Sequence, residues 1–140
     1  MILIDTNVIL RSKQKSSPHY QEVTETLVKL VEDEEELIIC PQVIYEFYVV
    51  VTRPIEQNGF GLSMDIALSE IDNILATYSM PVENSQVFFI WQQLIAHYKV
   101  IGKNAHDARI VAFMLSNNIN KLYTLNKRDF VRFNPIIELV

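Results

Sequence analysis

Cysteine and glycine are scarce in this chain. The first scarcity excludes an internal disulfide, and the second argues against disorder. Cys40 is the only cysteine among the 140 residues, so no disulfide can form within the chain, which fits a reducing cytoplasm. Only 3 residues are glycine and 49% are hydrophobic, which argues against a disordered chain. This length suits one compact domain, and we expect residues 1–140 to form a single domain.

Long apolar runs and a basic N-terminal region are also missing. No apolar run approaches the roughly 18 residues that a membrane span requires. Asp5 interrupts the apolar residues near the N-terminus, and no basic residue precedes them, so the pattern does not predict a signal peptide. We therefore expect a cytoplasmic protein with no membrane association.

Basic residues are a minority, and they are unevenly spread. The 12 Lys and Arg against 17 Asp and Glu give a net charge of −5. Residues 1–98 hold 5 basic against 14 acidic residues, whereas residues 99–140 hold 7 against 3. A polyanion is therefore expected to dock beside the C-terminal third. The alternative is that the acidic run Glu32–Glu36 is a solvated helix end that distorts the count.

Short apolar runs alternate with stretches of helical spacing. Strands are expected at Ile2–Ile4, Leu37–Cys40, Leu122–Leu125 and Ile136–Val140, with Met80–Val82 as a short strand or a link. Helices are expected from Ser17-Pro18 to about Glu35, from Pro41 to about Thr52, from Ser63 to Tyr78, from Ser85 to Tyr98 and from Asn104 to about Ser116. Strands separated by helices imply a parallel sheet covered on both faces, with its site outside the carboxyl ends of the strands.

Four acidic residues stand where a carboxylate is unexpected. Asp5 follows the first predicted strand directly. Glu46 lies in a helix that is apolar on almost every side, where an unpaired carboxylate is costly. Asp107 comes near the start of a later helix, and Asp129 comes just past a strand end. In a parallel sheet these positions converge on one edge.

Each of the last three acids has an ordinary alternative. Glu46 could lie on a solvated stripe or pair with Arg53. Asn104 is predicted to cap its helix, so Asp107, at the third helical position, could bond back to the cap's amide. Asp129 could be a simple turn aspartate.

A convergent acidic set needs neutralisation. Two unpaired carboxylates about 4 Å apart repel by roughly 4 kcal/mol at an effective dielectric near 20. A hard divalent cation with oxygen ligands, Mg²⁺ or Mn²⁺, would remove this repulsion. The neighbouring small polar residues that could orient the ligands or bound waters are Thr6, Asn7, Thr124 and Asn126.

Together these residues resemble the PIN-domain ribonucleases, most closely the toxins of VapBC toxin–antitoxin pairs. The matching pieces are Ile4-Asp5-Thr6-Asn7-Val8, Glu46, His106-Asp107-Ala108 and Thr124-x-Asn126-x-x-Asp129-Phe130. The resemblance implies a PIN-like three-layer α/β/α fold with a central, mainly parallel sheet of four to five strands.

The resemblance also implies an activity and partners. The activity is a Mg²⁺- or Mn²⁺-dependent endoribonuclease that hydrolyses phosphodiester bonds of single-stranded or structured RNA, as the toxin of a type II toxin–antitoxin system. The implied catalytic and metal-binding acids are Asp5, Glu46, Asp107 and, more variable in the family, Asp129. A cognate antitoxin protein is the implied partner, and such toxins often form homodimers.

Two other interpretations stay open. A catalytically inactive PIN-like module that binds RNA or protein would not need the complete acidic set. A haloacid-dehalogenase-type phosphatase would need a second aspartate where Asn7 stands. For an RNA substrate, the candidate phosphate contacts are Lys103, Arg109, Lys127, Arg128 and Arg132.

Overall fold

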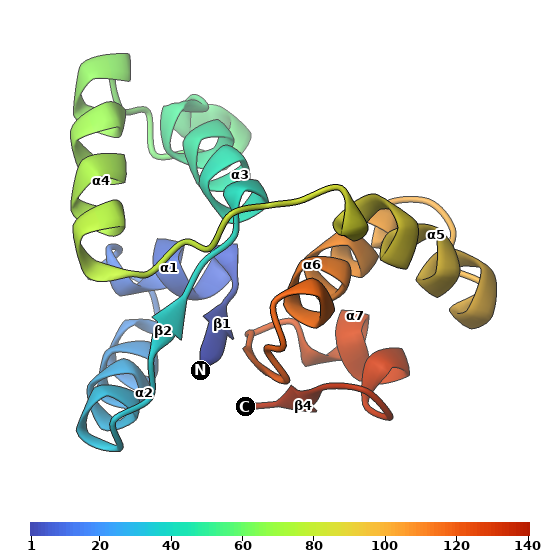
Figure 1. Ribbon diagram of the computed structural model, residues 1–140. Helices are drawn as coiled ribbons and strands as arrows, with labels where there is room; N and C mark the ends of the chain where they lie inside the picture. Colours follow the sequence, from blue (N-terminus) through green and yellow to red (C-terminus); the bar gives the residue numbers. More distant parts are fainter.

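Seven α-helices surround four short strands in a computed structural model that describes all 140 residues (Figure 1). The strands are β1 (Ile2–Ile4), β2 (Leu37–Ile38), β3 (Lys121–Tyr123) and β4 (Glu138–Leu139). The helices are α1 (Thr6–Ser12), α2 (Tyr20–Glu32), α3 (Pro41–Thr52), α4 (Met64–Thr77), α5 (Gln86–Tyr98), α6 (Asn104–Ser116) and α7 (Lys127–Phe130), with two 3₁₀ helices, η1 (Ile55–Gln57) and η2 (Val131–Phe133). No helix is both long enough and apolar enough to cross a membrane.

The four strands form one parallel sheet in the order β2-β1-β3-β4. The two central strands are in register, with Ile4 opposite Tyr123. Asp5 and Thr124, the residues that follow these strands, therefore leave the sheet side by side at its carboxyl edge. This is the edge where open parallel sheets carry their sites.

Helices lie on both sides of the sheet and give the expected three layers. In Figure 1, α2 and α4 lie at the left, α1 and α3 lie above β2 and β1, and α5 to α7 lie at the right, above β4. Within these groups α1 packs against α2 and α3, and α6 packs against α5 and α7. The predicted α/β/α architecture is confirmed.

The core is centred on β1 and α6. All three residues of β1 are fully buried, as expected for the strand of a parallel sheet that is covered on both faces. Residues 110–114 of α6 are buried without a break, so α6 is enclosed nearly all round. The largest fully buried side chains are Phe47, Phe113, Phe130 and Phe133.

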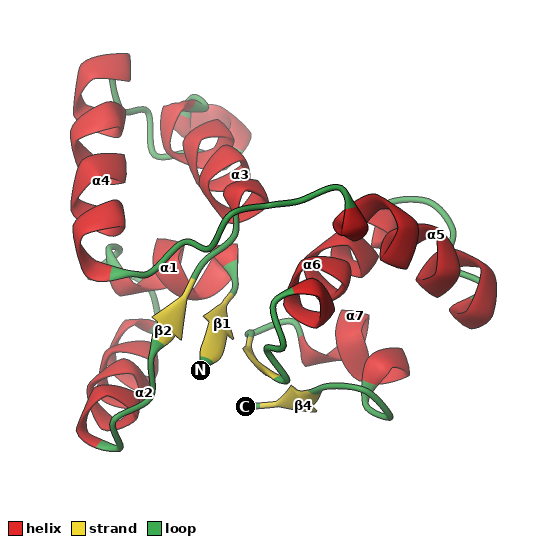
Figure 2. Ribbon diagram, viewed as in Figure 1, coloured by secondary structure: helices red, strands yellow, loops and turns green.

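The link between α4 and α5 contains no strand, so the sheet has four strands and not five. Figure 2 shows this segment as a loop throughout. Ser79 makes a single parallel bridge to Ile38, and Pro81, which has no N–H group, follows two residues later. The segment Met80–Val82 is thus a link, the second of the two alternatives.

The sequence did not predict α1, and it misplaced some boundaries. Thr, Asn, Val and Ile are only moderate helix formers, and seven residues are too few for a helix that is stable by itself. Burial of three consecutive residues, Val8 to Leu10, holds α1 in place. The Ser17-Pro18 start was also wrong, because the Ser17 hydroxyl accepts from the His19 amide and α2 begins at Tyr20. The strands β2 and β4 are shorter than expected.

Candidate active site

Asp5 ends β1 and caps α1. Its Oδ1 accepts a hydrogen bond from the Thr6 amide at 2.7 Å, so the carboxylate covers the first turn of the helix. The residue is 5% exposed, and this burial raises the pKa of its carboxyl group. Hydrogen bonds from Thr124 and Thr6 lower the pKa again in part, and the Glu46 carboxylate raises it further.

The end of β3 contacts the end of β1 through the same carboxylate. The Thr124 hydroxyl donates to Asp5 Oδ2 at 2.7 Å, and the Asn7 amide donates to the same oxygen at 2.8 Å. Asn7 Oδ1 in turn accepts from the Leu125 amide at 3.0 Å. Two of the small polar residues chosen from the sequence thus fix the orientation of Asp5.

Glu46 turns toward Asp5 rather than toward solvent or Arg53. Its Oε2 accepts from the Thr6 hydroxyl at 2.8 Å, and its Oε1 accepts from the Gln42 amide at 2.7 Å. The proposed pairing with Arg53 does not occur, because the Arg53 guanidinium donates to the Asn58 carbonyl. The residue is half-buried on α3.

Gln42 is a positioning residue that the sequence analysis missed. Its side chain is 6% exposed and uses its amide fully: Nε2 donates to Glu46 and to the His106 carbonyl, and Oε1 accepts from Arg109. Its only sequence signal is a polar residue one turn before Glu46 in an otherwise apolar helix. Arg109 also pairs with Glu83, so it is less free for a phosphate than the sequence suggested.

Asp107 lies in the first turn of α6 without the capping role considered for it. The helix begins at Asn104, Lys103 is its N-cap, and Asp107 is the fourth helical residue. Its carboxylate makes no hydrogen bond to the cap, so the capping-box alternative is wrong. Burial raises the pKa of Asp107 to about 7, with further increases from Asp129, then Asp5 and Glu46.

Asp129 stands at the margin of the group. It lies in the short helix α7, is half-buried, and is the carboxylate that raises the pKa of Asp107 most. Asn126 is exposed just before it, and its backbone amide donates to the Thr124 hydroxyl at 3.0 Å. The segment after β3 therefore supplies one acid and two polar residues to the same edge of the sheet.

Three of the four acids line one hollow of about 420 Å³. The three are Asp5, Glu46 and Asp107, while Asp129 lies outside its lining. The rest of its lining is largely apolar and includes Leu10, Tyr45, Val49, Val50 and Phe130. We call this the acidic hollow.

The donor set suits a hard divalent cation, although the side chains do not form a preformed metal-binding site. All the candidate ligands are carboxylate oxygens, and the hydrogen bonds to Asp5 and Glu46 come from neutral amides and hydroxyls. No cationic side chain neutralises the group by direct contact. However, no three His, Cys, Asp or Glu side chains lie close enough together to hold an ion as they stand. The carboxylate oxygens are ligands of the kind that Mg²⁺ or Mn²⁺ binds. Their present placement does not define a coordination geometry.

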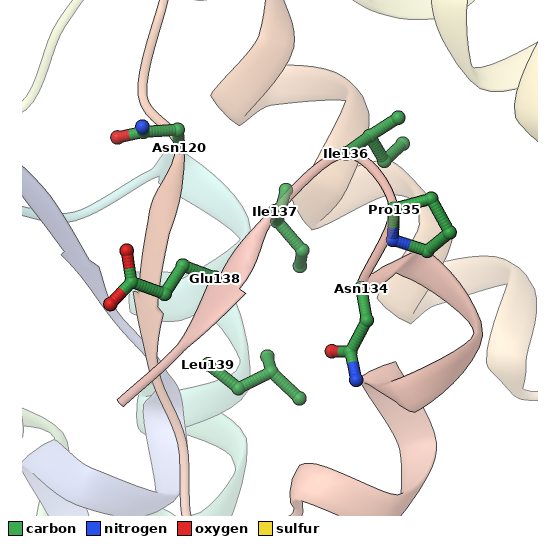
Figure 3. A pocket seen from close by; sticks show the side chains of 7 residues that line it. All are labelled: Asn120, Asn134, Pro135, Ile136, Ile137, Glu138 and Leu139. Carbon is green, nitrogen blue, oxygen red and sulfur yellow. The ribbon is translucent and has the colours of Figure 1, made fainter.

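A second hollow, of about 480 Å³, lies elsewhere, beside the edge strand β4 (Figure 3). Its lining includes Asn120, Asn134 and a single carboxylate, Glu138. In Figure 3 the Glu138 side chain points to the opposite side of the strand from Leu139. With one titratable group and none of the four acids, this hollow lacks the chemistry of the first.

The chain belongs to the PIN domain family, because a sequence model of that family matches residues 2–134. No curated protein sequence matches the chain.

Solved structures share its fold over nearly the whole length. VapBC2 from Rickettsia felis, bound to a DNA fragment from its promoter, has a TM-score of 0.72 at 19% identity and covers 100% of this chain and 98% of that one. VapBC-1 from nontypeable Haemophilus influenzae has the same score and identity, covering 100% and 97%. VapC20 from Mycobacterium tuberculosis, a toxin that cleaves the sarcin–ricin loop, has a TM-score of 0.67 at 14% identity and covers 94% of each chain. At these identities the likeness establishes the fold.

Proposed function

We propose that this protein is a Mg²⁺- or Mn²⁺-dependent endoribonuclease that acts as the toxin of a type II toxin–antitoxin system. The observation that carries the proposal is the gathering of Asp5, Glu46 and Asp107 in one hollow, with Asp129 beside it and no cation in contact. A purely structural role would not require carboxylates placed so that they raise the pKa of Asp5 and of Asp107. The PIN family membership supports the same conclusion.

In the proposed reaction, the chain's own residues hold the acids in position. Thr6 and Gln42 hold the two oxygens of Glu46, while Asn7 and Thr124 hold Oδ2 of Asp5. Asp107 accepts no hydrogen bond, so both of its oxygens are free for a ligand. A bound divalent cation supplies charge neutralisation and a water of lowered pKa for attack on the RNA phosphodiester.

The proposed partners are a cognate antitoxin and a second copy of the chain. Several structures of the same fold are toxin–antitoxin complexes, including the two VapBC complexes above. Exposed apolar residues give this chain surfaces for such contacts, among them Ile66 and Leu68 on α4 and Phe88 and Phe89 on α5. Acting on RNA, the protein would work in the cytoplasm.

Asp107→Asn tests the function against the structural alternative. Purified wild type and variant are incubated with RNA and millimolar Mg²⁺ or Mn²⁺, and cleavage is followed on a gel. We expect cleavage to fall by orders of magnitude, since a neutral amide cannot replace the carboxylate's charge. Asp65→Asn is the matched control, because Asp65 also lies in the first turn of a helix but is exposed and does not line the acidic hollow.

Stability measurements separate the two roles of Asp107. In EDTA at pH 8, where Asp107 is ionised, Asp107→Asn should be as stable as wild type or slightly more so, because one repelling charge is gone. Glu46→Gln should likewise stop cleavage and leave the protein folded. Equal cleavage by Asp107→Asn and wild type would remove Asp107 from the site.

The alternative is a PIN domain that binds RNA or protein without catalysis. The absence of three acids close enough to hold an ion favours it. It predicts RNA binding with no cleavage under any divalent metal, and the same gel decides between the two.

A further inference from the structure

A series of hydrogen bonds reaches Glu46 from outside the acidic hollow. The carboxylate of Glu83, in the link between α4 and α5, pairs with one terminal nitrogen of the Arg109 guanidinium on α6. The other terminal nitrogen of Arg109 donates to Gln42 Oε1 at 3.2 Å, and Gln42 Nε2 donates to Glu46 Oε1 at 2.7 Å. The series therefore joins the link to α6 and α3, the two helices that carry Asp107 and Glu46.

The ion pair at the start of this series belongs to a separate hollow of about 400 Å³. Glu83 and Arg109 line it together with Phe88 and Trp91 of α5, and it shares no lining residue with the acidic hollow. The Arg109 side chain is 37% exposed and that of Glu83 is 24% exposed. An ion pair of this exposure adds little to stability by itself. The contact with Gln42 gives the pair another role.

Arg109 fixes which end of the Gln42 amide faces Glu46. A glutamine amide can be flipped with almost no change of shape, and the flip exchanges its NH2 group and its oxygen. A guanidinium can only donate hydrogen bonds, so Arg109 requires the Gln42 oxygen on its own side. The NH2 group then faces two acceptors, the Glu46 carboxylate and the His106 carbonyl. Without Arg109, the buried oxygen of Gln42 loses its donor and the amide is free to turn away.

Glu83 keeps the guanidinium in this position. An arginine without a partner would be drawn to the acids, and a direct pair with Glu46 would occupy oxygens that a metal ion needs. Glu83 neutralises Arg109, and the rigid fork of the guanidinium lets one nitrogen pair with Glu83 while the other donates to Gln42.

We propose that the Glu83–Arg109 pair positions Glu46 through the side-chain amide of Gln42. Arg109 and Glu83 are then positioning residues that contact neither the metal nor the RNA. The inference rests on the proposed function, and it extends the metal site to two residues outside the acidic hollow.

Arg109→Met tests the proposal, because methionine keeps much of the length of the side chain but cannot donate to Gln42. Binding of Mn²⁺ is titrated without RNA, by the loss of the electron-spin-resonance signal of the free ion, so that a lost phosphate contact has no effect. We expect the Kd for Mn²⁺ to rise about 10-fold, as for other residues that orient metal ligands. Glu83→Gln should raise it less, because Arg109 can still donate.

The matched control is a second ion pair of similar exposure. Lys13 and Glu70 join the end of α1 to α4, and their side chains are 29% and 33% exposed. Neither lines the acidic hollow. Lys13→Met and Glu70→Gln should leave the Kd for Mn²⁺ unchanged, and melting curves confirm that every variant is folded.

A double-mutant cycle shows whether Arg109 acts through Gln42. If it does, adding Arg109→Met to Gln42→Ala should change the Kd for Mn²⁺ little further, because the contact between the two residues is already lost. A separate structural effect of Arg109 would instead appear in full in both backgrounds.

The orientation of Gln42 can also be followed without metal or RNA. Nuclear magnetic resonance of isotope-labelled protein in EDTA reports the side-chain NH2 signals of Gln42, assigned by their loss in Gln42→Ala. Both hydrogens are donated within the protein, so their exchange with solvent should be slow. In Arg109→Met the signals should shift and exchange faster, whereas Lys13→Met should leave them unchanged.

The measurements distinguish failure of this inference from failure of the proposed function. Unchanged Mn²⁺ binding in Arg109→Met, an equal change in Lys13→Met, or full additivity with Gln42→Ala would overturn the inference. If the wild type binds no Mn²⁺ and cleaves no RNA, the proposed function fails and the Gln42 signals decide. A shift confined to Arg109→Met would then uphold the orienting role of the pair, and unchanged signals would overturn it.

Discussion

At the scale of single residues, the site depends on neutral side chains as much as on acids. Glu46 keeps its position through Thr6 from one helix and Gln42 from its own. Gln42 is the more informative of the two, because it also contacts the backbone of α6 through the His106 carbonyl. It therefore couples the helix that carries Glu46 to the helix that carries Asp107.

Gln42→Ala should impair catalysis without touching the acids themselves. Loss of a residue that orients metal ligands costs about 10- to 100-fold in metal affinity or activity. We expect the Mg²⁺ concentration for half-maximal cleavage to rise by a factor in that range. A metal titration of the cleavage rate measures it, with Gln92→Ala on the exposed side of α5 as control. An unchanged metal requirement would limit Gln42 to a packing role.

At the scale of elements, polar contacts join neighbouring strands at both ends of the sheet. At the carboxyl edge, the Thr124 hydroxyl after β3 donates to Asp5 after β1. At the opposite edge, Glu35 before β2 accepts from Lys121 at the start of β3 and from the N-terminal amine before β1. Short strands offer few ladder hydrogen bonds, so these contacts matter for strand alignment.

Thr124→Val should destabilise the fold and not only the site. Thr124 is 1% exposed, and its hydroxyl also accepts from the Asn126 amide. Valine keeps the shape but leaves buried polar partners unsatisfied, at a cost of about 1–3 kcal/mol in the free energy of unfolding. Urea denaturation tests this. Thr77→Val, which removes an exposed hydrogen bond within α4, should cost much less.

The Glu35 cluster should make stability depend on pH in the acid range. The hydrogen bond from Lys121, then that from the N-terminal amine, lowers the pKa of Glu35 from 4.5 to about 2. A carboxyl group with a lowered folded-state pKa stabilises above its unfolded pKa and loses this contribution as the pH falls. The stability difference between wild type and Glu35→Gln should therefore be largest above pH 5 and vanish near pH 2. Urea midpoints across that range measure it, and a constant difference would contradict the pairing.

At the scale of the whole molecule, charge is divided between adjoining surfaces. The acidic hollow concentrates carboxylates, and the hollow beside it concentrates cations, since its lining includes Arg11, Lys103, Lys127 and Arg128. The cations attract a polyanion. The carboxylates repel it until a metal ion neutralises them. Metal binding and substrate binding should thus be linked.

Metal should stabilise the folded protein because it relieves carboxylate repulsion. A ligand that binds only the folded state adds about 2.7 kcal/mol at 100 times its Kd. We expect the melting temperature to rise in millimolar Mg²⁺ or Mn²⁺ relative to EDTA, and to rise less in Asp107→Asn. Identical melting temperatures under all three conditions would count against a metal site.

The sequence by itself determined most elements and the identity of the candidate acids. Apolar runs marked β1 and β3, and helical periodicity marked α3 and α6, because burial on one face or on both leaves a local pattern. Asp5 and Glu46 stood out because a carboxylate among apolar residues is costly unless it is partnered. The resemblance then supplied the role that we propose for them, which no local pattern contains.

Only the tertiary structure decided what these residues touch. The partner of Glu46 is Thr6, 40 positions away, and that of Asp5 is Thr124, 119 positions away. The strand order, the buried amide of Gln42 and the pairing of Arg109 with Glu83 likewise depend on which elements meet. Helix α1 escaped prediction for the same reason: its stability comes from the burial of Val8 to Leu10 against the core, and packing of that kind is not encoded in the propensities of seven residues.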